Sequence, residues 1–171
     1  MRSKIALGLI ACVLFVAVVP GLAQGNRGKA ELKAGAGTIT LDYGRPSLKG
    51  RDMLSKLEVG AFWRMGMNQA TVLTTPVSLT FGSVKVPAGA YSLWLKLAAS
   101  EKYELVFNSQ TGIWGTMHDP SKDVFSVPFS KEAQANPVEV FTIDLKSAPR
   151  GGILSLSWGS LLLSADFQFA Q

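Results

Sequence analysis

The sequence contains only one cysteine and one histidine among its 171 residues. Cys12 lies in an apolar stretch near the N-terminus, so the rest of the chain has neither a disulfide nor a thiol nucleophile. The single imidazole, His118, excludes a metal site made of several histidines. The sequence also lacks a G-x-S-x-G elbow, an H-E-x-x-H helix, a P-loop and a Ser-x-x-Lys pair. These absences favour a non-enzymatic protein without a cofactor, and no residue is assigned a catalytic role.

Charged residues are also few, at 17% of the chain, whereas hydrophobic residues make up 47%. This balance excludes intrinsic disorder for most of the sequence. The net charge is +5, and Arg2 and Lys4 at the N-terminus supply two of those charges. Because the remaining excess is modest and no run of Lys and Arg alternates with aromatic residues, we expect no nucleic-acid partner.

The first residues, 1–23, have the three parts of a secretory signal peptide. Two cations precede an apolar run, 5–19, and the small residues Gly21 and Ala23 come before a cut at Gln24. The run is shorter than the roughly 18–20 residues that span a bilayer, and an uncleaved anchor is the alternative. We therefore expect a periplasmic or secreted protein with no stable membrane span after cleavage.

The sequence after the signal changes character once. Residues 24–37 are rich in glycine and polar residues and predict a flexible leader. Beyond them apolar residues alternate with polar ones, as Ile39, Leu41 and Tyr43 show. Alternation with one polar face is typical of antiparallel strands, because strands of parallel sheets are apolar on both faces. Further segments with strand character are 71–75, 77–81, 91–97, 103–108, 124–129, 141–145, 153–158 and 161–169.

Turn residues separate these segments. Gly159-Ser160 predicts a two-residue hairpin of type II′, with positive φ at Gly159. Only Asp52–Leu57 has a helical pattern, of at most two turns. The short, evenly spaced strands predict an all-β fold, a mostly antiparallel β-sandwich or a partly closed barrel with one short helix. We expect a single domain over residues 38–171.

The segment from His118 to Asp123 combines an imidazole with two carboxylates. Such groups are able to bind a cation, but Asp119-Pro120 is also the ordinary start of an Asx-type turn. Lys122 lies among the candidate ligands and repels a cation. We therefore favour the turn and expect no metal.

Three motifs stand out from the strand pattern. They are Tyr43-Gly44-Arg45-Pro46-Ser47-Leu48-Lys49-Gly50-Arg51, Trp63-Arg64-Met65-Gly66-Met67-Asn68-Gln69-Ala70 and Pro87-Ala88-Gly89-Ala90-Tyr91-Ser92-Leu93. Together they resemble an exported bacterial family known as domain of unknown function 2911, over most of the chain from Thr38 onward. The resemblance implies no established activity and therefore no catalytic residue. Gln69 stands where many members have an acidic residue, so the resemblance implies no carboxylate role there.

The first two motifs suggest a ligand-binding site. If residues 63–68 are extended, Arg64 and Asn68 share one face of the strand. The glycines at 44, 50 and 66 then leave the backbone open to a ligand. Guanidinium groups beside Tyr, Trp and an amide suit a carboxylate, a phosphate or a sugar acid. The candidate ligand-binding residues are Tyr43, Arg45, Arg51, Trp63, Arg64 and Asn68.

A second interpretation gives the same arginines a structural role. They hydrogen-bond to carbonyls of the long connection 44–61 and pair with Asp42 or Asp52, while Trp63 anchors the core. We favour this role, because arginines often fasten long loops and ligand sites are few in any protein.

Two further tryptophans allow alternative interpretations. Trp94 shares a strand face with Ser92 and Lys96, and Trp114 lies in a loop beside Gly112. Exposed aromatic residues stack on sugars, but tryptophan is usually buried, so we expect burial or edge packing.

The sequence thus predicts an exported, non-enzymatic module of the cell envelope that binds an anionic small molecule, a glycan or an envelope protein. One alternative is a hydrolase of glycans or envelope polymers, acting through carboxylates that the sequence does not single out. Another is a structural subunit that pairs through exposed strand edges.

Overall fold

A computed structural model describes residues 26–51, 54 and 56–170. The predicted signal peptide lies outside the described residues. The described part of the chain forms a 12-stranded sheet and one turn of 3₁₀ helix, η1 (Pro120–Lys122). The strands are β1 (Arg27–Ala34), β2 (Gly37–Gly44), β3 (Phe62–Arg64), β4 (Thr71–Thr75), β5 (Leu79–Phe81), β6 (Val84–Val86), β7 (Gly89–Ala99), β8 (Lys102–Asn108), β9 (Asp123–Glu132), β10 (Val138–Ala148), β11 (Gly151–Gly159) and β12 (Leu161–Phe169).

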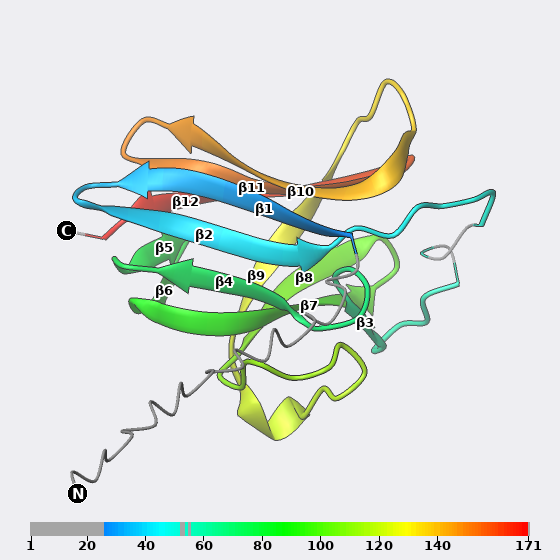
Figure 1. The fold of residues 1–171 in the computed structure, drawn as a ribbon, viewed down its shortest axis with the longest axis horizontal. Helices are drawn as coiled ribbons and strands as arrows, with labels where there is room; N and C mark the ends of the chain where they lie inside the picture. The colour runs from blue at the N-terminus through cyan, green and yellow to red at the C-terminus, as the bar shows by residue number, and fades with distance from the viewer. Residues whose placement is uncertain (1–25, 52–53, 55, 171) are drawn as a thin grey trace, which may run out of the picture.

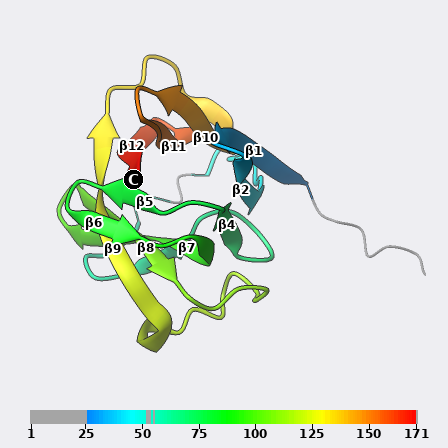
Figure 2. The ribbon, with the colours of Figure 1, turned by 90° about the vertical axis from the view of Figure 1, so that its left-hand side faces the viewer.

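The strands curl into a nearly closed antiparallel barrel. Their hydrogen-bonded order is β1-β2-β4-β7-β8-β9-β12-β11-β10. Strand β3 pairs with the same strand, β7, as β4 does, and the β5–β6 hairpin is attached to β12. The two ends of the order, β1 and β10, lie against each other (Figure 1). Figure 2 shows the strands arranged in a ring around the interior. The predicted all-β antiparallel fold is confirmed, in its barrel form.

Alternate side chains of the strands fill this barrel. In β2, Ile39, Leu41 and Tyr43 are buried, whereas Thr40 and Asp42 between them are partly exposed. Each fully buried side chain of this size contributes about 1.5–3 kcal/mol to folding. The largest fully buried side chains of the interior include Phe107, Phe129 and Phe141. Because these side chains occupy the interior, pockets open at an end of the barrel and on its outer wall.

A second, smaller apolar cluster covers part of the outer face. Trp94 of β7 and Val106 of β8 are buried there, and Phe62 and Ile113 pack against them. The cluster forms because the chain after β8 folds back over the sheet, where the Ala70 amide donates to the Ile113 carbonyl at 3.0 Å.

Most strand predictions are confirmed, for β2, β4, β5 and β7 to β12. The hairpin prediction is confirmed as well, since Trp158 pairs with Leu161 and Gly159 has a φ of 59°. The short strands β3 and β6 were not predicted, because three residues are too few to display a period of two.

The prediction of a flexible leader over residues 24–37 is wrong for Arg27–Ala34, which forms β1 along the full length of β2. Its charged residues alternate with Ala30, Leu32 and Ala34, which face the core. Alanines are small enough to be missed as core residues, yet Ala30 pairs opposite the much larger Leu41 and completes the packing there.

The helix predicted at Asp52–Leu57 lies partly outside the described residues. The described positions, Leu54 and 56–57, form a bend and a turn in which the Leu57 amide donates to the Leu54 carbonyl at 3.1 Å. In the part of the chain that the structure describes, we find no helix with the length and apolar character needed to cross a membrane.

Candidate functional site

The first two motifs meet where the chain crosses itself. A Cβ atom added to Gly66 would lie 2.6 Å from the Gly44 carbonyl oxygen, and one added to Gly44 would lie 2.6 Å from the Met67 nitrogen. Gly44 and Gly66 therefore pack backbone against backbone, so the prediction of a backbone open to a ligand is wrong for these two, whereas a Cβ added to Gly50 would meet no atom within 4 Å. The extended conformation that the ligand-site hypothesis required of residues 63–68 does not continue beyond Arg64, because β3 ends there and Asn68 has a φ of 62°.

Two of the predicted site residues, Tyr43 and Trp63, point into the core. The Tyr43 ring meets Phe141 edge to face, with centroids 5.9 Å apart. Trp63 stacks on Trp158 at 5.6 Å and contacts Phe141 edge-on at 5.4 Å. Trp63 is therefore the core anchor of the second interpretation, and it holds β3 against the barrel.

Arg51 fastens its own loop, as that interpretation expects. Its Nε donates to the Leu48 carbonyl at 3.1 Å and its Nη2 to the Ser47 carbonyl at 3.2 Å. The same loop is joined to β10, since the Leu48 amide donates to the Glu139 carbonyl at 2.9 Å. The loop thus extends the sheet beyond the end of β2.

The partners expected for the other arginines differ from those found. Asp42 forms its ion pair with Arg27 of β1, and Asp52 lies outside the described residues. Arg45 lies over Gly28 beside the Tyr43 ring, and its buried Nε has no hydrogen-bond partner among the described residues.

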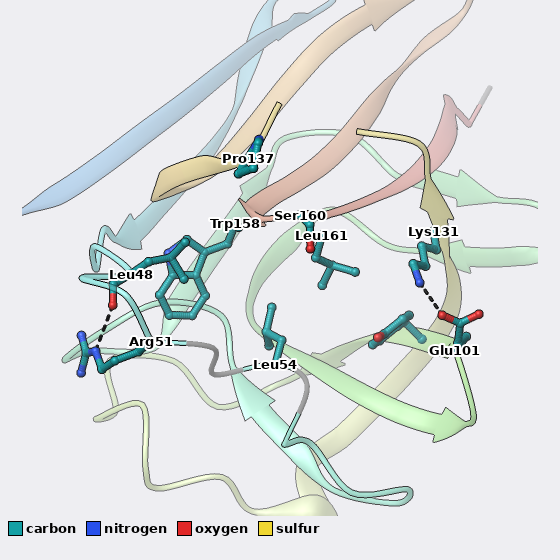
Figure 3. Close-up of a pocket in the computed structure, with 11 residues that line it drawn as sticks. Leu48, Arg51, Leu54, Glu101, Lys131, Pro137, Trp158, Ser160 and Leu161 are labelled. Carbon is teal, nitrogen blue, oxygen red and sulfur yellow. Dashed lines mark hydrogen bonds and ion pairs between the residues drawn. The ribbon is translucent and has the colours of Figure 1, made fainter. Parts of the chain in front are cut away.

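A pocket of about 480 Å³ opens at the end of the barrel where this loop lies, and we call it the end pocket (Figure 3). Its wall is polar and apolar in about equal parts, with Arg51 on one side and Lys131 with Glu101 on the other. Its lining residues are Leu48, Arg51, Leu54, Glu101, Tyr103, Lys131, Pro137, Trp158, Gly159, Ser160 and Leu161. Only Arg51 belongs to the predicted site, yet the pocket combines the expected residue types, with Tyr103 and Trp158 in place of Tyr43 and Trp63.

The charges on the far side of the end pocket neutralise each other. Lys131 donates a hydrogen bond to Glu101, which together with its charge lowers the pKa of Glu101 below the ordinary value. The same contact raises the pKa of Lys131. Both groups are therefore charged at neutral pH, and the net positive charge of the end pocket comes from Arg51.

A second pocket, of about 330 Å³, lies on the outer wall over β3, and we call it the outer pocket. It is lined by Phe62, Trp63, Arg64, Trp94, Gly115, Thr116 and His118. Arg64 packs against Gly115, where an added Cβ would lie 3.0 Å from Arg64 Cδ. The Asn68 carbonyl accepts from the Gly115 amide at 2.7 Å and so holds this wall of the pocket in place. Arg64 and the Asn68 carbonyl therefore meet at Gly115 in this wall, whereas Arg51 lines the end pocket.

His118 is held on three sides in the outer pocket. Its ring stacks on Trp94 and lies against Phe62, with both centroid distances at 4.4 Å. Its Nε2 lies 2.9 Å from Oδ1 of Asp123. The fully buried Asn108 donates to the same Oδ1 at 2.8 Å and orients the carboxylate.

The turn predicted in this segment is confirmed. Asp119 accepts from the Ser121 amide at 2.9 Å and begins η1. The hydrogen bonds from Ser121 lower the pKa of Asp119. No group of three or more His, Cys, Asp or Glu side chains that could hold a metal ion occurs in the described ranges.

Trp94 and Trp114 differ in their exposure to solvent. Trp94 is only 2% exposed, because His118 and Ile113 cover it, as expected. Trp114 remains 46% exposed, so it is not buried, and edge packing, the other expected outcome, stays a prediction.

Sequence reasoning missed Tyr103, Lys131 and Asn108 as pocket or support residues. Tyr103 carried a partial signal, because it begins a predicted strand next to a turn, where side chains border the barrel end. Asn108 carried a stronger one, since an amide ending an apolar strand requires buried hydrogen-bond partners.

The fold and pockets together define a β-barrel with a packed interior and pockets at its surface. A family model described as Protein of unknown function (DUF2911) matches residues 26–167. The chain belongs to this family, as the three motifs suggested. No curated protein and no solved structure matches it.

Proposed function

We propose that the protein is a non-enzymatic binding module, and that its end pocket takes an amphipathic anion. The observation that carries the proposal is the combination of apolar side chains, Trp158 and Leu161 among them, with a cation at the edge, Arg51, that forms no ion pair with a described carboxylate. Pockets that bind small molecules combine apolar side chains with polar groups that set the orientation of the ligand. An apolar or aromatic body against Trp158 and Leu161, with an acidic group toward Arg51, fits this arrangement.

Arg51 retains the capacity to bind a ligand while it fastens the loop. A guanidinium has five N–H donors, and Leu48 and Ser47 accept from two of its nitrogen atoms. The donors that remain are able to bind a carboxylate, sulfonate or phosphate oxygen. Fastening also reduces the freedom of the side chain, so less entropy is lost when an anion binds.

The charge of the end pocket is best tested at Ser160, because this exposed residue lines the pocket without fastening the loop. We expect Ser160→Asp to weaken binding of anilinonaphthalene sulfonate about two- to fivefold and Ser160→Lys to strengthen it by a similar factor, since a single exposed charge contributes about 0.2–1 kcal/mol. Binding is measured by dye fluorescence. Neutral phenylnaphthylamine should bind both variants alike.

Two results would contradict this proposal. One is a dye affinity that the two Ser160 variants leave unchanged, and the other is an equal response to the same substitutions at Ser83. Ser83 is a matched control, because it is exposed in the β5–β6 turn and does not line the end pocket.

We also propose that the protein acts in the periplasm or outside the cell. The cations, apolar run and small residues of segment 1–23 support export. A cut before Gln24 would leave β1, which begins at Arg27, intact.

A further inference from the structure

The outer pocket is a second place where ligand chemistry is available, and it does not depend on the function proposed for the end pocket. Arg64 and His118 both line it. Arg64 has no ion pair with a described carboxylate, and the nearby acids have other partners, Lys96 for Glu104 and His118 for Asp123. Arg64 therefore offers donors to an anion.

The hydrogen bond between His118 and Asp123 fixes which ring nitrogen is available. An ionised carboxylate only accepts hydrogen bonds, and Asp123 already accepts from Asn108. The hydrogen between His118 and Asp123 therefore belongs to Nε2 of the imidazole. In a neutral ring this leaves Nδ1 as an acceptor, and no described residue donates to it.

The surroundings of His118 keep the ring in one orientation. Trp94 and Phe62 contact its faces, and Asn108 fixes the carboxylate that holds its Nε2. A ring held in this way presents Nδ1 in a constant direction, which is a requirement for selecting a ligand. The adjoining cation, Lys96, lies over the Phe62 ring 5.7 Å from its centroid and pairs with Glu104.

We propose that the outer pocket binds a hydroxycarboxylate of the sugar-acid type, with Arg64 donating to its carboxylate and Nδ1 of His118 accepting from one of its hydroxyl groups. Because Arg64 donates and Nδ1 of His118 accepts, the pocket selects a ligand that carries both a carboxylate and a hydroxyl group. A simple carboxylate lacks the hydroxyl and a neutral sugar lacks the charge, so each makes only half of these contacts. The pocket volume of about 330 Å³ accommodates a single sugar ring.

The first test compares three probes by isothermal titration calorimetry. Glucuronate carries both groups, acetate only the carboxylate and glucose only the hydroxyls. We expect glucuronate to bind about tenfold or more tighter than glucose, which lacks the hydrogen bond to the charged Arg64, and about two- to tenfold tighter than acetate, which lacks the hydrogen bond to the neutral Nδ1. Equal affinity for glucuronate and acetate would overturn the proposal.

Variants separate the two partners. Arg64→Gln should weaken the binding of glucuronate about tenfold. His118→Phe keeps the ring stacking, so it should lower the affinity for glucuronate to that for acetate and leave the affinity for acetate unchanged. Lys85→Gln is the matched control, since Lys85 is an exposed cation of β6 outside the outer pocket. If Lys85→Gln weakens glucuronate as much as Arg64→Gln does, diffuse charge explains the binding and the proposal fails.

The single histidine makes a spectroscopic test unambiguous. Nitrogen NMR of the imidazole in its neutral form should show hydrogen on Nε2. Addition of glucuronate should then shift the Nδ1 resonance and not that of Nε2. Hydrogen on Nδ1, or an unchanged Nδ1 resonance at saturation, would overturn the proposal even if His118→Phe failed to fold. Binding of anilinonaphthalene sulfonate at the end pocket is independent of all these outcomes.

Discussion

At the scale of single residues, the crossing of Gly44 and Gly66 explains why two motifs distant in sequence contain glycine. Each motif passes the other at backbone contact, so neither position has room for a Cβ atom. The crossing also directs Trp63 into the core and Arg64 to the outer wall, because they are neighbours in the short strand β3. A steric requirement between backbones therefore determines where the arginine of the second motif acts.

We expect Gly44→Ala to destabilise the protein by about 3 kcal/mol or more, because the new methyl group meets the Met67 backbone, which cannot move aside as a side chain would. Gly82→Ala is the control, since φ at Gly82 is 57° and no atom lies within 4 Å of an added Cβ. It should cost only the backbone strain of about 1 kcal/mol. Denaturant unfolding measures both, and an equal loss in the two variants would refute the crossing as the cause.

At the scale of elements, β1 is the strand that closes the barrel. It pairs with β2 on one side and lies against β10 on the other, so it brings the two ends of the sheet together. Its Arg27 forms the ion pair with Asp42 that the sequence had assigned to the loop arginines. Without β1, the paired edge of β2 and the core beneath it would face water.

Replacement of Ala34 tests whether β1 is part of the folded barrel. Ala34 is 1% exposed, so Ala34→Asp should lower the free energy of unfolding by about 3 kcal/mol or more through burial of an unpaired charge. The adjacent Lys33 is exposed, and Lys33→Asp should change the free energy of unfolding by no more than about 0.5 kcal/mol. Thermal unfolding distinguishes the two. If both variants melted like the wild type, residues 27–34 would behave as a leader after all.

At the scale of the whole molecule, the barrel is filled by its own side chains, and its openings are peripheral. The end pocket collects residues from the loop after β2, the β7–β8 turn, the end of β9 and the β11–β12 turn. Closure of the sheet brings these segments to one end. The outer pocket instead depends on the segment between β8 and β9, which folds back over β3 and β7.

Export of the whole protein should remove residues 1–23. When the full chain is expressed with its N-terminus intact, we expect the secreted or periplasmic product to begin at Gln24, as intact mass and N-terminal sequencing will show. The folded barrel remains complete after that cut, because β1 begins at Arg27. A product that starts within β1, or a chain that retains residues 1–23 in the membrane, would contradict the prediction.

Much of the barrel was predictable because its signals are local. Alternation such as Ile39, Leu41 and Tyr43 identifies a strand from six residues, and Gly159-Ser160 identifies a hairpin from two. The candidate site was less predictable. The expected types, arginine with tyrosine and tryptophan, do surround the end pocket, but two of the three come from elsewhere in the chain.

The all-β antiparallel class, most strand positions, the hairpin before β12 and the Asx turn at Asp119 follow from the sequence, since each depends on contacts between residues close in the chain. The tertiary contacts were needed to separate Arg51 and Arg64 into different pockets, to choose the core over the ligand site for Tyr43 and Trp63, and to show that Asp123 orients His118. Strand order, the glycine crossing and barrel closure place these side chains together from positions far apart in the sequence. Periodicity assigns a side chain to a face of its own strand, but it carries no information about which distant segment covers that face.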